Sequence, residues 1–294
     1  MNSRRPCIFG EVLFDHFPDG SRILGGAPFN VAWHLQAFGQ APRFISRVGD
    51  DIEGAQVREA MADWGMDTDA VQSDDSLPTG RVNVTLEGNE PSYDIVRPAA
   101  FDAIDSAEIC NDCELLYHGS LALRDTASRA ALDRVLATTR GLVFIDVNLR
   151  PPWWDREHVI GLLARADWLK INIDELRTLH PERKDDDDNV RHLIDDHGLD
   201  GVVVTRGADG ATLFARGAGD CSVAPDASVD LVDTVGAGDA FAAVIILGLI
   251  HQWPHATMLE RAQAFASRVV ANRGAILTEN AAYRPFVENW KLAN

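Results

Sequence analysis

The sequence has few cysteines and no long apolar run, and each shortage excludes a class of protein. Four cysteines in 294 residues are too sparse for a disulfide scaffold. Cys110 and Cys113 have CxxC spacing, but no second pair or histidine cluster accompanies them, so a zinc site is not expected. The longest apolar run, 240–250, is too short to span a bilayer, and no signal peptide is evident. We therefore expect a cytoplasmic protein.

Basic residues are outnumbered by acids, which limits the possible partners. The formal net charge is -18 and the sequence pI is about 4.8. This balance argues against nucleic acid or an anionic membrane as a partner. The hydrophobic content of 46% and charged content of 24% are those of an ordinary globular protein, long enough for one large domain or two modest ones.

Two well-known phosphate-binding motifs are also missing. No Gly-Lys dipeptide occurs anywhere in the chain, which excludes a P-loop of the Walker type. No GxGxxG follows the first expected strand, so a dinucleotide-binding fingerprint is excluded as well.

Short apolar runs alternate with longer helical patterns along most of the chain. The expected strands are 7–14, 43–49, 114–119, 142–148, 168–173 and 201–207, and the expected helices are 27–39, 52–64, 126–139, 155–166, 189–197, 237–251 and 257–272. The repeated order of strand then helix predicts a parallel sheet with right-handed crossovers. Four consecutive aspartates, 185–188, are interpreted as a solvated loop before a helix.

Residues 79–97 break this rhythm, because apolar and polar residues alternate on both sides of a turn at 87–91. That pattern predicts a β-hairpin. A two-stranded ribbon is marginal alone, so we expect it to form part of a small lid with other short strands. We also expect the lid to pair two subunits into a homodimer.

The stretch 233–239, DTVGAGD, places two glycines and a carboxylate at the start of an apolar helix. The first-turn N–H groups of a helix lack internal partners and attract anions, commonly phosphate. Gly236, Ala237 and Gly238 let an anion come close, and Asp239 in the first turn is expected to stay ionised and to accept a proton from a hydroxyl. A carboxylate that merely stabilises the helix explains Asp239 but not the glycines.

Two further groups of residues favour a polar ligand. Gly25 and Gly26 precede a helix that carries Asn30, and Asp15 ends the first strand, so these side chains can recognise hydroxyls. A Gly-Gly turn with a capping Asn explains them equally well. Polar residues at later strand ends, in 146–150, 172–175 and 205–210, fall where ligands collect in open α/β sheets, although capping and turn chemistry also place such residues there.

These motifs resemble those of PfkB-type carbohydrate kinases of the ribokinase superfamily. The stretch 233–239 resembles the C-terminal motif, Gly25, Gly26 and Asn30 resemble the N-terminal one, and Asn172 with Glu175 resembles the NxxE motif linked to magnesium and phosphate. The resemblance covers essentially the whole chain. It implies an α/β, ribokinase-like three-layer sandwich with a mainly parallel central sheet and a small β lid, forming one kinase domain over 1–294.

The resemblance also implies ATP-dependent transfer of the γ-phosphoryl group to a sugar hydroxyl, with Asp239 as the base and the N–H groups of 236–238 as the anion hole. The implied sugar-binding residues are Asp15, Gly25, Gly26, Asn30, Arg97 and Arg150. The implied nucleotide-binding residues are Asn172, Glu175, Thr205, Gly207, Gly210 and Gln263. Mg²⁺ is an implied cofactor, and a K⁺ site is implied at Asp233, Val235, Val269, Asn272, Gly274 and Thr278.

Within the family, GGAPxN at 25–30 and DVNLRPPWW at 146–154 look most like fructokinases. A 2-keto-3-deoxygluconate kinase stays open, because Arg97 and Arg150 suit a substrate carboxylate. A catalytically silent sugar-binding protein on the same fold is the third alternative. Two residues depart from the pattern: Arg206 stands where relatives usually carry an apolar residue, and Phe29 is bulky enough either to narrow the sugar pocket or to fill the core.

Overall fold

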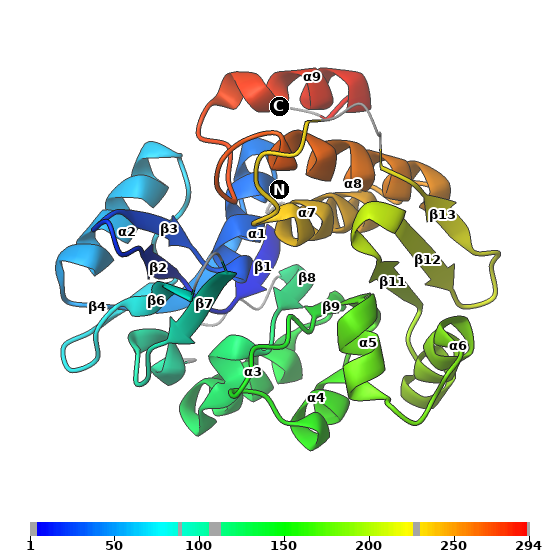
Figure 1. The fold of residues 1–294 in the computed structure, drawn as a ribbon, viewed down its shortest axis with the longest axis horizontal. Coiled ribbons are helices and arrows are strands. Elements are labelled where there is room, and N and C mark those ends of the chain that lie inside the picture. The colour runs from blue at the N-terminus through cyan, green and yellow to red at the C-terminus, as the bar shows by residue number, and fades with distance from the viewer. Residues whose placement is uncertain (1–4, 88–89, 106–112, 226–229, 293–294) are drawn as a thin grey trace.

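A computed structural model describes residues 5–87, 90–105, 113–225 and 230–292, and shows a central sheet between two helical layers (Figure 1). The nine strands of this sheet lie in the order β13-β12-β11-β10-β9-β8-β1-β4-β5. They are β1 (Arg5–Phe9), β4 (Arg43–Gly49), β5 (Val71–Asp74), β8 (Cys113–His118), β9 (Leu142–Asp146), β10 (Trp168–Asn172), β11 (Gly201–Thr205), β12 (Ala211–Ala215) and β13 (Cys221–Val223). All neighbours are parallel except β11-β12 and β12-β13.

The sequence of the central strands explains why they are covered on both faces. In β11, Val202, Val203 and Val204 are all fully buried, as is typical of a parallel strand under two helical layers. The strand order reverses beside β1, which has β4 on one side and β8 on the other. Ligands of open α/β sheets bind beyond the carboxyl ends of strands at such a switch point.

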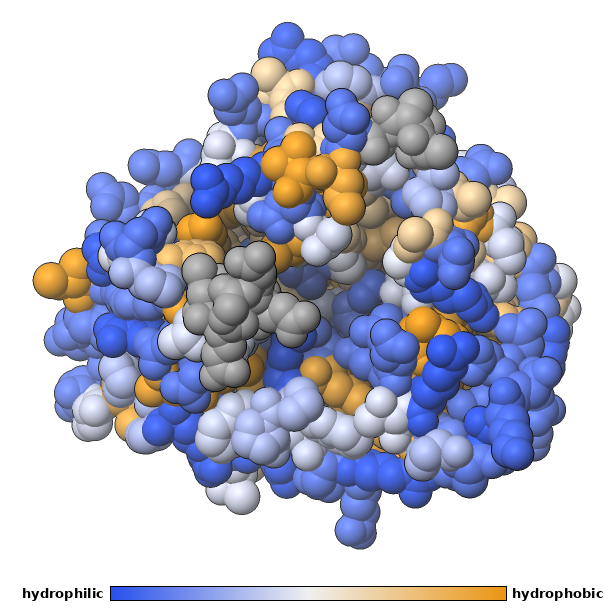
Figure 2. All heavy atoms as spheres, in the orientation of Figure 1, coloured by the Kyte–Doolittle hydropathy of each residue, from blue (hydrophilic) through white to orange (hydrophobic). Residues whose placement is uncertain are grey.

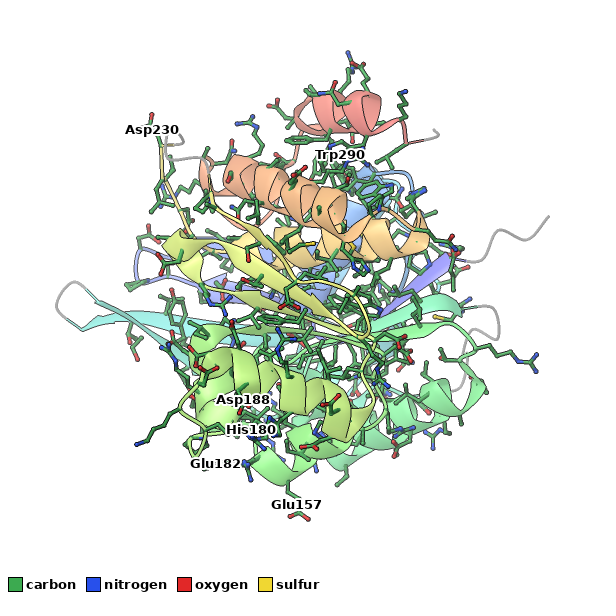
Figure 3. The ribbon with its side chains drawn as sticks, turned by 90° about the vertical axis from the view of Figure 1, so that its right-hand side faces the viewer. Glu157, His180, Glu182, Asp188, Asp230 and Trp290 are labelled. Atoms are coloured by element: carbon green, nitrogen blue, oxygen red, sulfur yellow. The ribbon has the colours of Figure 1, made fainter. Side chains whose placement is uncertain are left out.

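Helices cover the two faces of the sheet and enclose separate hydrophobic cores. One layer contains α1 (Ala27–Ala37), α2 (Ile52–Asp63), α7 (Ala237–Ile250), α8 (His255–Val270) and α9 (Asn280–Trp290); the other contains α3 (Thr126–Thr138), α4 (Arg156–Leu163), α5 (Ile173–Leu179) and α6 (Asp186–His197). Figure 3 shows the layers edge on, with Trp290 pointing from α9 toward the helices beneath it, where it stacks on Phe38. Most residues of α7 are buried, so this helix lies inside the first layer. No helix in the described ranges is long and apolar enough to cross a membrane.

A second sheet forms the lid, in the order β3-β2-β6-β7. Its strands are β2 (Leu13–His16), β3 (Arg22–Gly25), β6 (Gly80–Glu87) and β7 (Glu90–Ile95). Register places Asp15 beside Ile23 and Val82, on the lid face that lines the cavity described below. His16 and Arg22 belong to the opposite face, where both contact Glu53 at the start of α2. In Figure 3 the β6–β7 ribbon, in cyan, extends beyond the main body.

The hairpin and its membership of a small sheet are confirmed, but several expected boundaries are wrong. The expected strand at 7–14 is two strands in different sheets, because the chain passes from the main body to the lid after Phe9. The aspartates at 185–188 are not a loop: Asp185 caps α6, and the next three residues form its first turn, where carboxylates favour the helix dipole. Helices α5 and α9 and strands β5, β12 and β13 were not expected.

The expected turn at 87–91 includes residues 88 and 89, and the CxxC pair includes Cys110; these three residues lie outside the described ranges. Cys113 is a free, buried thiol at the start of β8. The homodimer was expected because the ribbon looked unsupported. In the structure β2 pairs with β6 and supports it, so the dimer stays a prediction without that argument.

Candidate active site

A cavity of about 490 Å³ opens between the lid and the carboxyl ends of the central strands. Figure 2 shows this face of the molecule hollowed at its centre, with hydrophilic residues in the hollow. The polar and glycine residues that line the cavity are Glu11, Asp15, Gly25, Gly26, Asn30, Asp146, Asn148, Arg150, Lys170, Asn172, Glu175, Thr205, Asp233, Thr234, Gly236, Gly238, Asp239 and Gly274. Residues from all three groups found in the sequence therefore meet in one place.

The start of α7 forms one wall of the cavity, and its backbone needs glycine. Gly236 is the N-cap residue with φ 78, and a Cβ there would lie 2.4 Å from the Cα of Ala275. The N–H of Ala237 donates to the carbonyl of Thr234, whereas those of Gly236 and Gly238 have no protein acceptor within the described ranges. Both the free N–H groups and the helix dipole favour an anion at this position.

Asp239 lies in the first turn of α7 and connects the two halves of the sequence. Asn30 on α1 donates from Nδ2 to Asp239 Oδ2 at 2.7 Å. Burial raises the pKa of Asp239 to about 6, although the hydrogen bond from Asn30 and the charges of Lys170 and Arg150 act to lower it. The sequence predicts an ionised carboxylate at this helix start, and burial acts against that ionisation. Near pH 7 the group is nonetheless mainly a carboxylate and can accept a proton.

The raised pKa predicts how turnover depends on pH. If Asp239 is the base, kcat/KM rises with pH through about 6, because only the ionised carboxylate accepts the hydroxyl proton. An unperturbed aspartate would place this rise near the ordinary value of 3.8. The measurement is kcat/KM between pH 4.5 and 8.5, with the coupling enzymes in excess at every pH. A flat profile down to pH 5 would contradict the assignment of Asp239.

A buried ion pair lies directly beneath the start of α7, and sequence reasoning missed its basic member. Lys170 Nζ on β10 is 2.6 Å from Asp146 Oδ2 on β9, and the two residues are 5% and 2% exposed. A Cβ built on Gly238 would lie 3.3 Å from Lys170 Nζ, so the ammonium group faces the anion-binding turn. Burial acts to lower the pKa of Lys170, but the carboxylates of Asp146, Glu175 and Asp239 together outweigh it and the net pKa is raised. The available signal was a lysine within an otherwise apolar strand.

Asn172 and Glu175 form a capping box at the start of α5. The Asn172 side chain accepts from the Glu175 N–H at 2.8 Å, and Glu175 Oε2 accepts from the Asn172 N–H at 3.0 Å. Glu175 Oε1 also accepts from the N–H of Leu149 at 2.8 Å, which fixes the loop after β9. Burial, followed by the charge of Asp146, raises the pKa of Glu175. Since both carboxylate oxygens already accept backbone N–H groups, this pair positions two cavity walls.

Several expected site residues lie outside the cavity. Arg97 pairs with Asp125 at 2.7 Å and lies over the Trp153 ring. Gln263 on α8 donates to Ser267, and Gly207 and Gly210 lie beyond Thr205 in a turn that does not line the cavity. Of the expected nucleotide-binding residues, Asn172, Glu175 and Thr205 line the cavity.

The expected potassium-binding residues divide in the same way. Asp233, Val235 and Gly274 line the cavity, whereas Val269, Asn272 and Thr278 do not. Asp233 accepts from the N–H groups of Val235 and Gly274, both at 3.0 Å, and so joins the start of α7 to the loop after α8. Asn272 uses its side-chain amide to bind the carbonyl of Arg268. Carboxylate oxygens suit a hard cation, but only three of the six expected residues line the cavity, so the fit to K⁺ is partial.

The two residues that departed from the family pattern take no part in the cavity. Arg206 donates to Thr212 at 3.0 Å and to Asp187 at 3.3 Å, on the surface beside α6. Phe29 is fully buried in the core and packs against Trp33 and Phe44. Phe29 therefore fills the core and does not narrow the cavity.

Carboxyl groups predominate at the lid end of the cavity. Burial raises the pKa of Asp15 to about 6, with Arg150 acting against it, and raises the pKa of Glu11 to about 7. Arg150 is exposed, and although its carbonyl accepts from the N–H of Trp153, its side chain has no hydrogen-bond or ion-pair partner in the described part of the chain. One arginine therefore faces three acidic groups, Glu11, Asp15 and Asp239. Its charge acts to lower each of their pKa values, against the larger effect of burial.

Comparison with known proteins agrees with this geometry. The model of the "pfkB family carbohydrate kinase" matches residues 8–282. A fructokinase of Escherichia coli is 31% identical over 263 residues, covering 84% of this chain and 85% of the relative. An aminoimidazole riboside kinase of Salmonella typhimurium is 31% identical over 290 residues, covering 92% of this chain and 90% of the relative.

Solved structures give the same picture. A fructokinase double mutant from Vibrio cholerae O395, bound to fructose, ADP and potassium ion, superposes with a TM-score of 0.82 at 27% identity, covering 95% of this chain and 97% of the other.

Proposed function

Since the chain belongs to the pfkB family of carbohydrate kinases, we propose that it transfers the γ-phosphoryl group of ATP to a hydroxyl of a neutral sugar, and that this sugar is fructose. The observation that carries the proposal is the position of Asp239, a carboxylate in the first turn of α7, beside two N–H groups that have no acceptor among the described residues. One group accepts the hydroxyl proton while its neighbours stabilise the charge of the transferred phosphoryl.

The residues of the cavity divide between the two substrates. Asp15, Gly25, Gly26 and Asn30 lie at the lid end and hold the sugar; Asn30 also keeps Asp239 aimed at the reacting hydroxyl through its 2.7 Å hydrogen bond. Asn172, Glu175 and Thr205 lie at the carboxyl ends of β10 and β11, on the nucleotide side. Lys170 adds positive charge beneath the anion-binding turn.

Charge favours a neutral sugar over a sugar acid. Three carboxyl groups and one unpaired arginine lie at the acceptor end of the cavity, and Arg97, the second arginine expected to bind a substrate carboxylate, is paired with Asp125 outside it. A substrate carboxylate would therefore meet more like charge than opposite charge, which costs binding free energy. The ordered catalytic groups argue equally against a catalytically silent protein.

Aminoimidazole riboside is the second candidate acceptor. A relative whose alignment covers 92% of this chain is an aminoimidazole riboside kinase. Apolar side chains suited to a planar ring also line the cavity: Leu13, Phe17, Ile23, Val82, Tyr93, Ile95 and Leu121. Fructose remains our proposal because the sequence pattern around 25–30 and 146–154 is fructokinase-like.

A coupled ADP-release assay tests the acceptor. The panel is D-fructose, D-ribose, adenosine, aminoimidazole riboside and 2-keto-3-deoxygluconate, each assayed with MgATP in the presence and absence of KCl. We expect the highest kcat/KM with fructose, and a value for the sugar acid at least tenfold lower, since one repelling contact of about 1.4 kcal/mol gives that ratio. Preference for the acid would refute the charge argument; preference for the riboside would replace fructose.

The metal ions and assembly are part of the same proposal. Mg²⁺ is supplied with ATP and, when bound, neutralises charge on the phosphates; the side chains present suit a hydrated ion, because both Glu175 oxygens already accept N–H groups. K⁺ would be held near Asp233 beside the start of α7; like Glu175, Asp233 already accepts N–H groups at both oxygens, so it would share them with the ion. We also propose a cytoplasmic homodimer that contacts through the lid, which sedimentation velocity tests.

A further inference from the structure

Glu11 is the least explained side chain of the cavity. It lies in the link between β1 and β2, belongs to no motif found in the sequence, and is 3% exposed. Its Oε2 atom is buried without a hydrogen-bond partner in the described part of the chain. Leaving a buried polar atom unpaired costs about 1–3 kcal/mol, so its presence in the cavity wall calls for a reason.

A second unpaired acceptor lies at the same end of the cavity. Asn30 gives its amide hydrogen to Asp239, while its Oδ1 atom is buried and has no partner within the described residues. Glu11, Asn30 and Asp15 all line the cavity. Two buried acceptor atoms without protein donors, Glu11 Oε2 and Asn30 Oδ1, beside the carboxyl group of Asp15, fit a ligand that supplies several hydroxyl donors.

The charges around Glu11 favour an uncharged ligand. Burial is the largest influence and raises the pKa of Glu11 to about 7; Arg150 and Arg124 lower it and Asp239 raises it. Near neutral pH the carboxyl group is present in both protonation states, and each can hydrogen-bond a hydroxyl. An anionic group would meet the charges of Asp15 and Asp239 as well.

We infer that Glu11 is a further substrate-binding residue, which hydrogen-bonds one hydroxyl of the acceptor sugar through Oε2 and thereby selects acceptors that carry it. The inference rests on the proposed function, since it requires a hydroxylated acceptor in this cavity. A site built around a substrate hydroxyl discriminates strongly against the analogue lacking it, because the protein group is then left unpaired.

The test is a cycle of enzyme variants and substrate analogues. The kcat/KM of D-fructose and of its monodeoxy analogues is measured for the wild type, Glu11→Met, Glu11→Gln and Glu53→Met. Methionine matches the length of glutamate but cannot bind a hydroxyl, and glutamine still can. Glu53 is 7% exposed, comparably buried, but contacts His16 and Arg22 on the opposite face of the lid, so it provides the matched control.

We expect one analogue to lose about 10²-fold or more in the wild type and to lose less than about threefold in Glu11→Met, because the contact is then already absent. Glu11→Gln restores part of the discrimination, and Glu53→Met keeps the wild-type pattern. Replacing an unpaired buried carboxyl by an apolar side chain is not expected to unfold the protein, and thermal unfolding of each variant is measured alongside.

Two results would overturn the inference. One is the wild-type analogue pattern in a folded Glu11→Met; the other is an equal loss for fructose and every analogue, which marks a structural role. Failure of the proposed function looks different, because the wild type itself then phosphorylates no neutral sugar, and the inference falls with it.

Discussion

Asp239→Asn lowers kcat about 10²–10⁴-fold while the protein stays folded, if this carboxylate removes the hydroxyl proton. An amide has nearly the same shape and its oxygen still accepts the hydrogen bond from Asn30, but it cannot take up a proton. The measurement is kcat with saturating sugar and ATP, together with sugar binding by calorimetry. Binding within about threefold of the wild type shows that the cavity is intact.

The stability of the same variant provides an independent check. Burial raises the pKa of Asp239 to about 6, above the ordinary value of 3.8, so the carboxylate is harder to ionise in the folded protein than in the unfolded chain. Such a group destabilises the folded state increasingly as pH rises from about 3.8 to 6, and the full penalty persists above that range. Asp239→Asn should therefore melt no earlier than the wild type at pH 8. Wild-type kcat in Asp239→Asn would refute the assignment of Asp239 as the base.

Lys170→Met is expected to damage both stability and catalysis. It leaves Asp146 buried without its partner, and breaking a buried ion pair in this way costs about 3–5 kcal/mol. It also removes the positive charge beneath Gly238, for which we expect a fall in kcat of at least about tenfold. The measurements are urea unfolding and kcat.

The double variant Lys170→Met, Asp146→Leu separates the two effects. An apolar pair of similar volume recovers much of the stability, because no buried charge is left unpaired. The loss of kcat remains. Lys170 lowers and Asp146 raises the pKa of Asp239, so the acid limb of kcat/KM moves to higher pH in the single variant and back toward the wild-type position in the double variant. Recovery of kcat along with stability would show that Lys170 is only structural.

The sequence could predict the parts of the site that depend on neighbouring residues. The glycines before α7 and the carboxylate after them are adjacent in the chain, and the helix start follows from residue types alone. Capping was one of the explanations open for residues 172–175, and the capping box of Asn172 and Glu175 bears it out.

The parts that were missed depend on contacts between distant segments. Lys170 and Asp146 are 24 residues apart and meet only because β9 and β10 are neighbours in the sheet. Arg97 was expected to bind substrate from the family resemblance, but it pairs with Asp125, 28 residues away. Glu11 lies in the apolar run 7–14, which was expected to form a single strand. No pattern within a short stretch of sequence indicates these contacts.

The lid and the main body each contribute one aspartate to the cavity. Asp15 lies on β2 of the lid, whereas Asp239 lies on α7 of the main body. If both bind the acceptor as proposed, the sugar is held from two sides, and a water molecule is too small to contact both. We therefore expect ATP hydrolysis without an acceptor to be slow, which an ADP-release assay without sugar measures.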